Sequence, residues 1–373
     1  MWKSITWRIT MIVLLTIAAV VVLVPSLTDN IPAAWKDNIP KINLGLDLQG
    51  GVFLRLQVEI EKAIENTAQR YADDARAVCR EKGLPVLGFQ KAGIDGFSLR
   101  LPPGEFAGKA QSLLKEEFPA LDVSLGEVKS DGAMVTGRMK PAEVQSIRAN
   151  AVGQGVETIR NRIDQFGVRE PQIIAEGDDR IVVQLPGVKD QQRAIELVGK
   201  TALLEFKLVD DGASLEEALK GNIPEDSQIL YQKSTDPATG RLAKSPILVK
   251  KRALLTGDTI KAAKVNFGGQ AGGAYVGISF DSRGAKVFDR VTAENVKRRL
   301  AIVLDDTVYS APVIQERISG GDAQITGSFT PEEASDLAIV LRAGSLPAPV
   351  KVIQNVTIGP SLGQDSIQKG VRA

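Results

Sequence analysis

The sequence predicts an α+β protein in which an N-terminal transmembrane helix is followed by sandwiches of helices over antiparallel sheets. Three observations predict this class. Residues 5–24 are largely apolar, alternating strands are joined by tight polar turns, and the order helix, strand, strand, helix, strand recurs along the chain. With 373 residues, the chain is long enough for two or three domains.

The N-terminal segment ITWRITMIVLLTIAAVVVLV contains an apolar core that begins at Ile9. Its length approaches the roughly 20 residues that span a bilayer. Lys3 and Arg8 precede this core, which predicts a cytoplasmic N-terminus and a main domain outside, in the periplasm of a bacterium. A cleaved signal peptide is the alternative, but no A-x-A-like site follows. The sequence therefore favours an uncleaved anchor over residues 1–26.

The stretch NLGLDLQGGVFLRLQVE follows the anchor, and its glycine pair, Gly50 and Gly51, leads into an alternating strand. A phosphate-binding loop would lead into a helix N-terminus instead, so that function is disfavoured. We expect the glycines to let the chain turn tightly from its membrane tether into the strand. We expect Asp47 to cap that turn.

The clearest copy of the repeat starts at Pro141 with an amphipathic helix that Gly167 is placed to cap. The strands PQIIAEG and RIVVQLPG follow, then a helix and the strand LLEFKLV. This order is one strand short of the ferredoxin-like βαββαβ sandwich. The missing strand is either residues 51–60, with residues 61–140 as an insertion, or an edge strand of each lobe's own.

Two further copies flank this one. The earlier runs from about Glu61 to Leu125, and the later from the strand AYVGISFD to the strand PVKVIQNVT. Between Asp210 and Lys251 the chain turns polar, which predicts loop with one short helix. GGQAGG, at residues 268–273, is predicted as a mobile linker. The exposed faces of LLEFKLV and AYVGISFD are either core or an edge for an extended polypeptide.

Composition argues against several chemistries. The chain has no histidine, which removes the commonest general base and the usual zinc ligand. Its single cysteine, Cys79, lies in a predicted helix and is interpreted as a structural thiol. A net charge of +1 gives no electrostatic case for nucleic acid. The sequence therefore predicts no catalytic residue, no cofactor and no metal.

Two acid pairs are the candidates for carboxylate chemistry, Asp178 with Asp179 and Asp305 with Asp306. Both pairs lie where a hairpin must turn, and aspartate side chains in turns cap local backbone N–H groups. No third ligand lies at EF-hand spacing. A catalytic or metal role is therefore disfavoured for both pairs.

Five motifs, in order along nearly the whole chain, also resemble one known family. They are LGLDLQGG, FGVREPQI with RIVVQLPG, RLAIVLDDTVYSAPVI, LRAGSLPAPV and IGPSLGQD. Together they are similar to the bacterial SecD subunits of the protein-export machinery. The motif positions expected to have structural roles are Gly45, Asp47, Gln49, Gly50, Gly51, Gly167, Pro171, Leu185, Pro186, Gly187, Gly344 and Pro347.

The resemblance implies a non-enzymatic accessory subunit of the inner membrane that works with SecF, the SecYEG channel and YajC. Such a subunit helps draw unfolded secretory polypeptide out on the periplasmic side, driven by the proton-motive force. The resemblance further implies that a head holding this polypeptide moves relative to a base near the membrane.

The resemblance also implies a division into domains. The ferredoxin-like base comprises residues 27–60, 141–209 and 347–358, and the head comprises residues 210–346. Residues 61–140 form an inserted α+β lobe, and the last residues, 359–373, approach a second transmembrane helix. Because SecD subunits continue through five more spans, the chain is interpreted as the N-terminal part of such a subunit.

The alternative function is a self-sufficient single-span protein that scaffolds an envelope assembly or binds the cell wall. It predicts a natural stop codon after Ala373, whereas a translocase subunit predicts a reading frame that continues into hydrophobic spans. An envelope hydrolase is disfavoured because no carboxylate pair or Ser-Lys arrangement suited to hydrolysis can be located.

Overall fold

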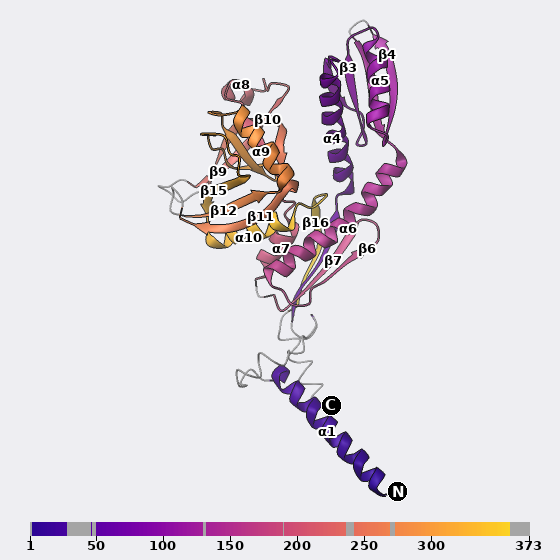
Figure 1. Ribbon diagram of the computed structural model, residues 1–373, viewed down its shortest axis with the longest axis vertical. Coiled ribbons are helices and arrows are strands. Elements are labelled where there is room, and N and C mark those ends of the chain that lie inside the picture. Colours follow the sequence, from indigo (N-terminus) through magenta and orange to yellow (C-terminus); the bar gives the residue numbers. More distant parts are fainter. Residues whose placement is uncertain are drawn as a thin grey trace.

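The chain forms a mixed α+β structure with several sheets, as the sequence predicts at the level of class. The computed structural model describes residues 2–27, 46, 50–129, 132–188, 190–235, 242–268 and 273–358. Figure 1 shows helix α1 (Trp2–Leu27) at one end of the molecule and a central sheet above it. Two larger bodies rise from that sheet, one on each side.

The transmembrane anchor expected over residues 5–24 is not supported. Among the residues that the structure describes, no helix is both long and apolar enough to cross a membrane. Helix α1 does form over this segment.

The central unit is an antiparallel sheet with the strand order β16-β1-β7-β6, covered by two helices. Val52, Leu54 and Leu56 alternate along its second strand and are fully buried, so one face of the sheet packs against helices. Its elements are β1 (Gly51–Val58), α6 (Pro141–Phe166), β6 (Gln172–Glu176), β7 (Arg180–Pro186), α7 (Gln191–Gly199) and β16 (Val350–Ile358).

Strand β1 settles one alternative that the sequence left open. It pairs with β7 on one side and with β16 on the other, and both partners are distant from it in sequence. The predicted long-range pairing of residues 51–60 is therefore confirmed for this sheet.

The lobe consists of the segment between β1 and α6. Its sheet has the order β2-β3-β5-β4, and α4 and α5 pack against it. Its elements are α4 (Ile60–Glu81), β2 (Gly88–Lys91), β3 (Gly96–Leu101), α5 (Phe106–Glu117), β4 (Leu121–Lys129) and β5 (Gly132–Met139). Cys79 is fully buried in this unit, and burial raises the pKa of its thiol, in line with a structural role.

The barrel unit contains a closed barrel, β10-β8-β13-β14-β9, and a three-stranded sheet, β11-β12-β15. Helix α10 packs against that sheet. The barrel strands are β8 (Leu204–Val209), β9 (Ser227–Thr235), β10 (Leu242–Thr256), β13 (Leu300–Leu304) and β14 (Thr307–Ser310). The other elements are α8 (Leu215–Leu219), the 3-10 turn η1 (Gly257–Thr259), β11 (Ile260–Phe267), β12 (Ala274–Phe280), α9 (Ser282–Glu294), β15 (Asp322–Phe329) and α10 (Pro331–Ala343).

The polar segment between Asp210 and Lys251 is not the loop that its composition predicts. It contains helix α8, strand β9 and much of strand β10, which pair along their length. Among the described residues of this hairpin, Leu230, Ile247 and Val249 belong to the barrel core. Because few of its residues face a core, the segment has the composition of a loop although it forms paired strands. Strand β8, expected in the same unit as β6 and β7, pairs instead with β10 and β13 of the barrel.

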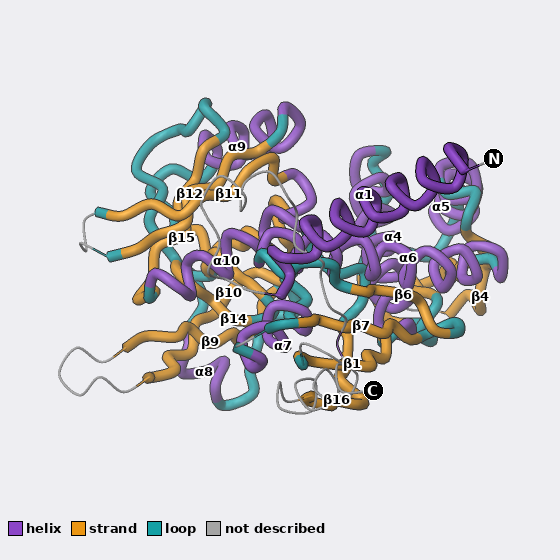
Figure 2. Tube along the Cα trace, turned by 90° about the horizontal axis from the view of Figure 1, so that it is seen from below, coloured by secondary structure: helices purple, strands orange, loops and turns teal. Residues whose placement is uncertain are grey.

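The three units differ in how their cores connect. One buried cluster runs through the lobe and the central unit. Two others lie mainly in the barrel unit, and one of these includes Leu197 of the central-unit helix α7. Figure 2, viewed from below, shows α4 and α5 on one side of the central sheet and β12, β15 and β9 on the other.

Candidate functional site

The opening motif forms the end of the central sheet where β1 begins. Gly50 and Gly51 have φ values of 70° and 140°, which glycine adopts readily. A Cβ atom at Gly51 would lie 2.2 Å from the carbonyl oxygen of Leu185, so no larger residue fits there. The backbone N–H of Gly187 donates to the carbonyl of Gly50 at 3.0 Å. No helix follows the glycines, which excludes the phosphate-loop geometry.

The other motif positions fall in separate places. Leu185 and Pro186 end β7 beside the glycine pair, so five of the predicted positions meet at one end of the sheet. Gly167 caps α6 in the left-handed conformation, and Pro171 immediately precedes β6. Gly344 follows α10, with Pro347 three residues later. The remaining predicted positions, Gly45, Asp47 and Gln49, lie outside the described residues.

The two acid pairs behave differently. Asp178 and Asp179 lie in the turn between β6 and β7, and Asp179 accepts a hydrogen bond from Gln57 at 3.3 Å. Asp305 and Asp306 both have left-handed φ values, 46° and 58°, in the turn between β13 and β14. Among the described residues, no cluster of three or more acidic, histidine or cysteine side chains could hold a metal.

The prediction that the aspartates of this turn cap local backbone N–H groups is wrong for Asp305. Its carboxylate accepts hydrogen bonds from the backbone N–H groups of Ala202 and Leu203, each at 3.0 Å. These groups belong to the segment that leads from α7 into β8, about a hundred residues earlier in the chain. Asp305 therefore fixes a connection between two units rather than its own turn.

A buried arginine lies at the same connection. Arg162, on α6, is fully buried and donates to the carbonyl oxygens of Leu197 at 3.0 Å and of Lys200. It also donates to the carbonyls of Thr201 at 3.3 Å and Gly344 at 3.0 Å. We call Arg162 together with these four carbonyl groups the Arg162 clamp.

The position of the guanidinium explains why it can be buried without a carboxylate in direct contact. It lies at the C-terminal ends of α7 and α10, where unpaired carbonyls and the helix dipoles favour a cation. Burial lowers the pKa of Arg162 to about 10, and the negative charge of Asp305 opposes this shift. The side chain therefore remains charged at neutral pH.

The segment at residues 200–203 is held from both sides. Its carbonyls accept from Arg162 of the central unit, and its N–H groups donate to Asp305 of the barrel unit. The returning chain joins here as well, because the N–H of Leu346 donates to the carbonyl of Thr201 at 2.8 Å. Ala202 has a φ of 61°, an uncommon conformation for a residue other than glycine.

A second contact between the same units is an ion pair between helices α7 and α10. The guanidinium of Arg193 donates to both carboxylate oxygens of Asp336, at 2.7–3.0 Å. These hydrogen bonds raise the pKa of Arg193. Its guanidinium carbon also lies 5.3 Å from the centre of the Phe166 ring, a cation–π contact. About a third of the Arg193 side chain remains exposed to solvent, at 32%.

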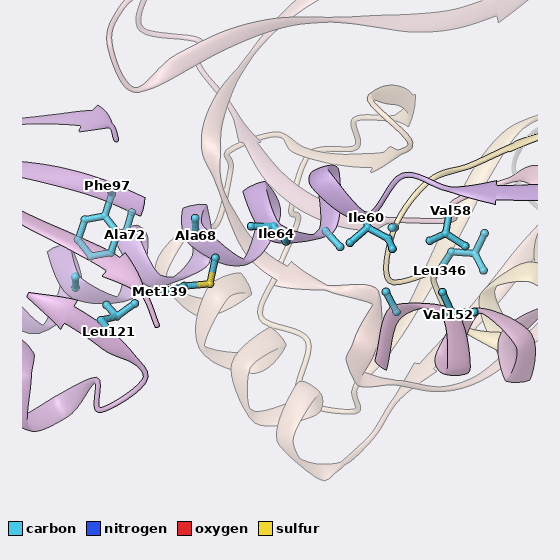
Figure 3. Packing of buried hydrophobic residues seen from close by; sticks show 14 of the residues in the cluster. Val58, Ile60, Ile64, Ala68, Ala72, Phe97, Leu121, Met139, Val152 and Leu346 are labelled. Atoms are coloured by element: carbon cyan, nitrogen blue, oxygen red, sulfur yellow. The ribbon is translucent and has the colours of Figure 1, made fainter. Parts of the chain in front are cut away.

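The junction between the lobe and the central unit has a different chemistry. Figure 3 shows its buried side chains in a continuous row along α4, from Phe97 and Ala72 through Ile64 to Val58 and Leu346. Ile64 is 1% exposed and Ile60 is 3% exposed. This junction is an unbroken apolar core.

Roles for Arg162, Arg193 and Asp336 were not predicted from the sequence. Arg162 is one of several basic residues on an amphipathic helix, and its partners are backbone carbonyls, which have no signature in sequence. One signal was available: Arg162 immediately precedes Ile163, on the helical stripe predicted to face the core.

Two protein-family models match segments of the chain. Residues 152–211 match the family model described as "Protein translocase subunit SecDF, P1 domain, N-terminal". Residues 227–348 match the model "SecDF, P1 head subdomain". These matches define the class of protein, a component of the Sec protein-translocation machinery with a P1 domain.

Curated relatives extend the match over the whole chain. The protein translocase subunit SecD of Syntrophobacter fumaroxidans is 48% identical over 374 residues, which cover 100% of this chain and 70% of the relative. The SecD of Magnetococcus marinus is 41% identical over 367 residues, which cover 98% of this chain and 69% of the relative. The chain belongs to the SecD family of protein translocase subunits.

A solved structure gives the same family. The chain matches "Crystal structure of SecDF in Super-membrane-facing form" with 31% identity and a TM-score of 0.50, covering 91% of this chain and 34% of that one.

The SecD of Calditerrivibrio nitroreducens is 49% identical over 89% of this chain, which corresponds to 64% of the relative's length. The chain thus spans about two thirds of the length of these curated relatives.

Proposed function

We propose that the chain is a non-enzymatic accessory subunit of the Sec translocase that binds polypeptide as it emerges and assists its translocation. The observation that supports this most directly is the barrel unit. Most of its buried residues form two clusters within the unit. It meets the central unit through the hydrogen bonds of Arg162 and Arg193 and through Leu197 of α7. A unit joined in this way can hold a segment of polypeptide and change its position without unfolding.

We propose that the central unit is the base and the barrel unit the head. The base would be ferredoxin-like, because β1, α6, β6, β7, α7 and β16 follow one another as βαββαβ in an antiparallel sheet. We place the start of the head at Leu204 rather than at residue 210, since β8 is a strand of the barrel. The lobe of residues 61–140 is proposed as an insertion into the base.

We propose that the subunit works at the bacterial inner membrane with base, lobe and head on the periplasmic side. SecF, the SecYEG channel and YajC are its proposed partners, and the proton-motive force is the proposed source of energy. The basis is membership of a family whose curated members are named protein translocase subunits.

The head offers apolar side chains that suit an extended polypeptide. Among its described residues, Tyr231 is 50% exposed and Phe267 is 70% exposed. Phe267 ends β11, an edge strand of the three-stranded sheet, where an added strand could pair with the backbone. We propose that unfolded secretory chains bind at such positions.

Deletion of the head tests this function. Removing residues 204–343 from the complete subunit and joining the ends with a short Gly-Ser linker should leave the base intact, because Thr201 and Leu346 are already hydrogen bonded to each other. We expect export of a secreted reporter protein to fall to the level of a strain without the subunit. Undiminished export would refute the proposal.

Photo-cross-linking locates the polypeptide. A photoreactive residue at Phe267 or Tyr231 should cross-link to a stalled secretory chain, and the matched exposed positions Leu87 in the lobe and Ile174 in the base should do so much less. Equal labelling at all four positions would contradict binding by the head.

A further inference from the structure

The central unit and the lobe have the same arrangement of strands and helices. The central sheet has the order β16-β1-β7-β6, and the lobe sheet, read in the corresponding direction, has the order β4-β5-β3-β2. Neighbouring strands are antiparallel in both sheets. A helix, two strands and a second helix follow one another in each unit, as α6, β6, β7 and α7 or as α4, β2, β3 and α5. Each strand of one sheet therefore has a counterpart in the other.

The glycines that start β1 and β5 show this correspondence at single residues. Gly51 and Gly132 have φ values of 140° and 143°. A Cβ atom at Gly51 would lie 2.2 Å from the carbonyl oxygen of Leu185, and one at Gly132 would lie 2.6 Å from that of Leu101. Leu185 is near the end of β7, and Leu101 ends β3.

Backbone hydrogen bonds at the other ends of β1 and β5 correspond as well. The N–H of Val58 donates to the carbonyl of Asp179 at 2.7 Å, and the N–H of Met139 donates to that of Asp95 at 2.9 Å. Asp179 and Asp95 lie in the turns that join β6 to β7 and β2 to β3. The two sheets can therefore be compared position by position.

In both units the helices cover one face of the sheet and leave the other uncovered. Side chains of a strand alternate between the two faces. Val52 and Leu54 of β1 belong to the buried core, so Phe53 and Arg55 lie on the uncovered face. We call this uncovered face of the central sheet the open face, and its residues include Phe53, Arg55, Ile174, Val182, Gln354 and Val356.

The uncovered faces of the two sheets differ in polarity at corresponding positions. Ile174 lies opposite Val182 in the central sheet, where Gln90 lies opposite Ser98 in the lobe. Ile174 is 56% exposed. The hydroxyl groups of Ser98 and Thr136 hydrogen bond to each other at 2.8 Å. The lobe thus has the polar face expected of an antiparallel sheet in contact with water, and the central sheet does not. Because the two units share one arrangement, the arrangement itself does not require an apolar face.

Arg55 lies across the open face. Its guanidinium donates to the side chains of Gln354 on β16 at 2.7 Å and Glu176 on β6 at 3.1 Å. Its guanidinium carbon is 5.9 Å from the centre of the Phe53 ring. Val356, opposite Phe53, is 40% exposed. Since Arg55 is tied to neighbouring strands, apolar side chains on the open face remain accessible to a partner.

We propose that the open face is a docking surface, and that its occupant is an apolar segment from the part of the SecD subunit outside this chain. The chain covers 70% of the Syntrophobacter fumaroxidans subunit and 69% of the Magnetococcus marinus subunit, so part of each lies outside it. The described chain leaves the central sheet at Ile358, the end of β16, and β16 itself carries Val356 of the open face. A segment that follows starts beside this face. The proposal does not depend on polypeptide binding by the barrel unit, and its test involves no translocation.

Cysteine labelling tests whether the face is covered. Ile174→Cys and the matched variant Gln90→Cys place a thiol at corresponding exposed positions of the two sheets. The native Cys79 is fully buried. We expect a water-soluble maleimide to label both variants at similar rates in the 373-residue chain. In the purified complete subunit, labelling of Ile174→Cys should slow about tenfold, as for a face that is free in one molecule in ten, and Gln90→Cys should be unchanged.

A second substitution tests whether the apolar side chains hold the occupant. In the complete subunit, Ile174→Asp should restore rapid labelling of Val356→Cys, because burying an unpaired carboxylate at the docking surface is unfavourable. Gln90→Asp is the control and should not restore it. Equal labelling of Ile174→Cys in the chain and in the complete subunit would overturn the proposal. So would protection that requires other translocase subunits, or protection that increases with protein concentration, since the occupant would then be another protein or a second copy.

Discussion

The central unit forms two junctions, one with the lobe and one with the barrel unit. The first is apolar, and the second is mainly polar. Toward the lobe, α4 carries one apolar core across the boundary, with Ile64 fully enclosed. Toward the barrel unit, the polar contacts are the Arg162 clamp, the carboxylate of Asp305 and the ion pair of Arg193 with Asp336. Leu197 of α7 adds an apolar contact, because it belongs to a core of the barrel unit. Phe166 packs against the cores on both sides of this second junction.

The two junctions differ in whether water can replace the contacts that hold them: water can replace hydrogen bonds but not apolar packing. Opening the apolar junction would expose side chains that each contribute about 1.5–3 kcal/mol on burial. At the other junction, the side chains of Arg193 and Asp336 would regain most of their hydrogen bonds from solvent if they separated. The same central unit therefore joins the lobe through a continuous apolar core and the barrel unit through contacts that are mainly polar.

Replacing Arg162 by methionine should have the largest effect and would break the polar junction. Methionine fills similar space but removes the Arg162 donor from the buried carbonyls of Leu197, Lys200 and Gly344, at about 1–3 kcal/mol each if none relaxes. The carbonyl of Thr201 keeps the N–H of Leu346 as a donor. With relaxation we expect a loss of about 4 kcal/mol in the free energy of unfolding, measured by chemical denaturation.

Arg160→Met on the same helix is the control for this change. Arg160 is exposed and pairs with Glu157 on the surface at 3.1 Å. Its loss should cost less than about 1 kcal/mol. If the two methionine variants were equally stable, the clamp would not be a principal support of the junction.

Replacing Ile64 by alanine should open a cavity in the apolar junction. Because Ile64 is 1% exposed, we expect a loss of about 3 kcal/mol, and the lobe should become sensitive to proteases before the barrel unit does. Ile174→Ala, at a position that is 56% exposed, should change the stability by less than about 0.5 kcal/mol. A lobe that stays resistant in the Ile64 variant would show that the boundary does not depend on this core.

The apolar junction is the part that sequence could predict. Ala63, Ile64, Ala68, Ala72 and Cys79 recur at helical spacing along α4, and this periodicity places them in a core. The alternation of β1 likewise predicted a strand, and the glycine pair predicted a sharp turn before it. Periodic patterns report burial directly, so elements of this kind are accessible without a structure.

The polar junction could not be predicted in the same way. Arg162 bonds to backbone carbonyls, which every residue has, and Asp305 bonds to N–H groups about a hundred residues away. A turn aspartate that caps its own backbone and one that caps a distant segment look the same in sequence. For the same reason, the polar hairpin of β9 and β10 was expected to be loop, since few of its residues face a core.

Replacing Gly51 by alanine should destabilise the central sheet without changing either junction. Gly51→Ala would place a Cβ atom 2.2 Å from the carbonyl oxygen of Leu185, in a backbone conformation that alanine rarely adopts. We expect a loss of about 2 kcal/mol in the free energy of unfolding, with the distances between units unchanged. Gly83→Ala, also at a positive φ but with nothing within 4 Å, should cost about half as much. Equal losses would mean that conformation, not the contact with β7, sets the requirement for glycine.

The smallest expected effect is a pH dependence confined to the barrel unit. Lys250 donates to Asp210 at 2.8 Å and to Asp226 at 3.0 Å, and the hydroxyl of Ser227 donates to Asp210 at 2.6 Å. The hydrogen bond from Lys250, followed by that from Ser227, lowers the pKa of Asp210. Its contribution to stability is therefore present above the unfolded pKa of about 3.9 and is lost as pH falls through the lower folded value. Calorimetry should find Lys250→Met less stable than the native chain at pH 6, with the difference shrinking toward pH 3. A difference that stays constant over this range would assign the loss to packing of the lysine stem instead of to the charge pair.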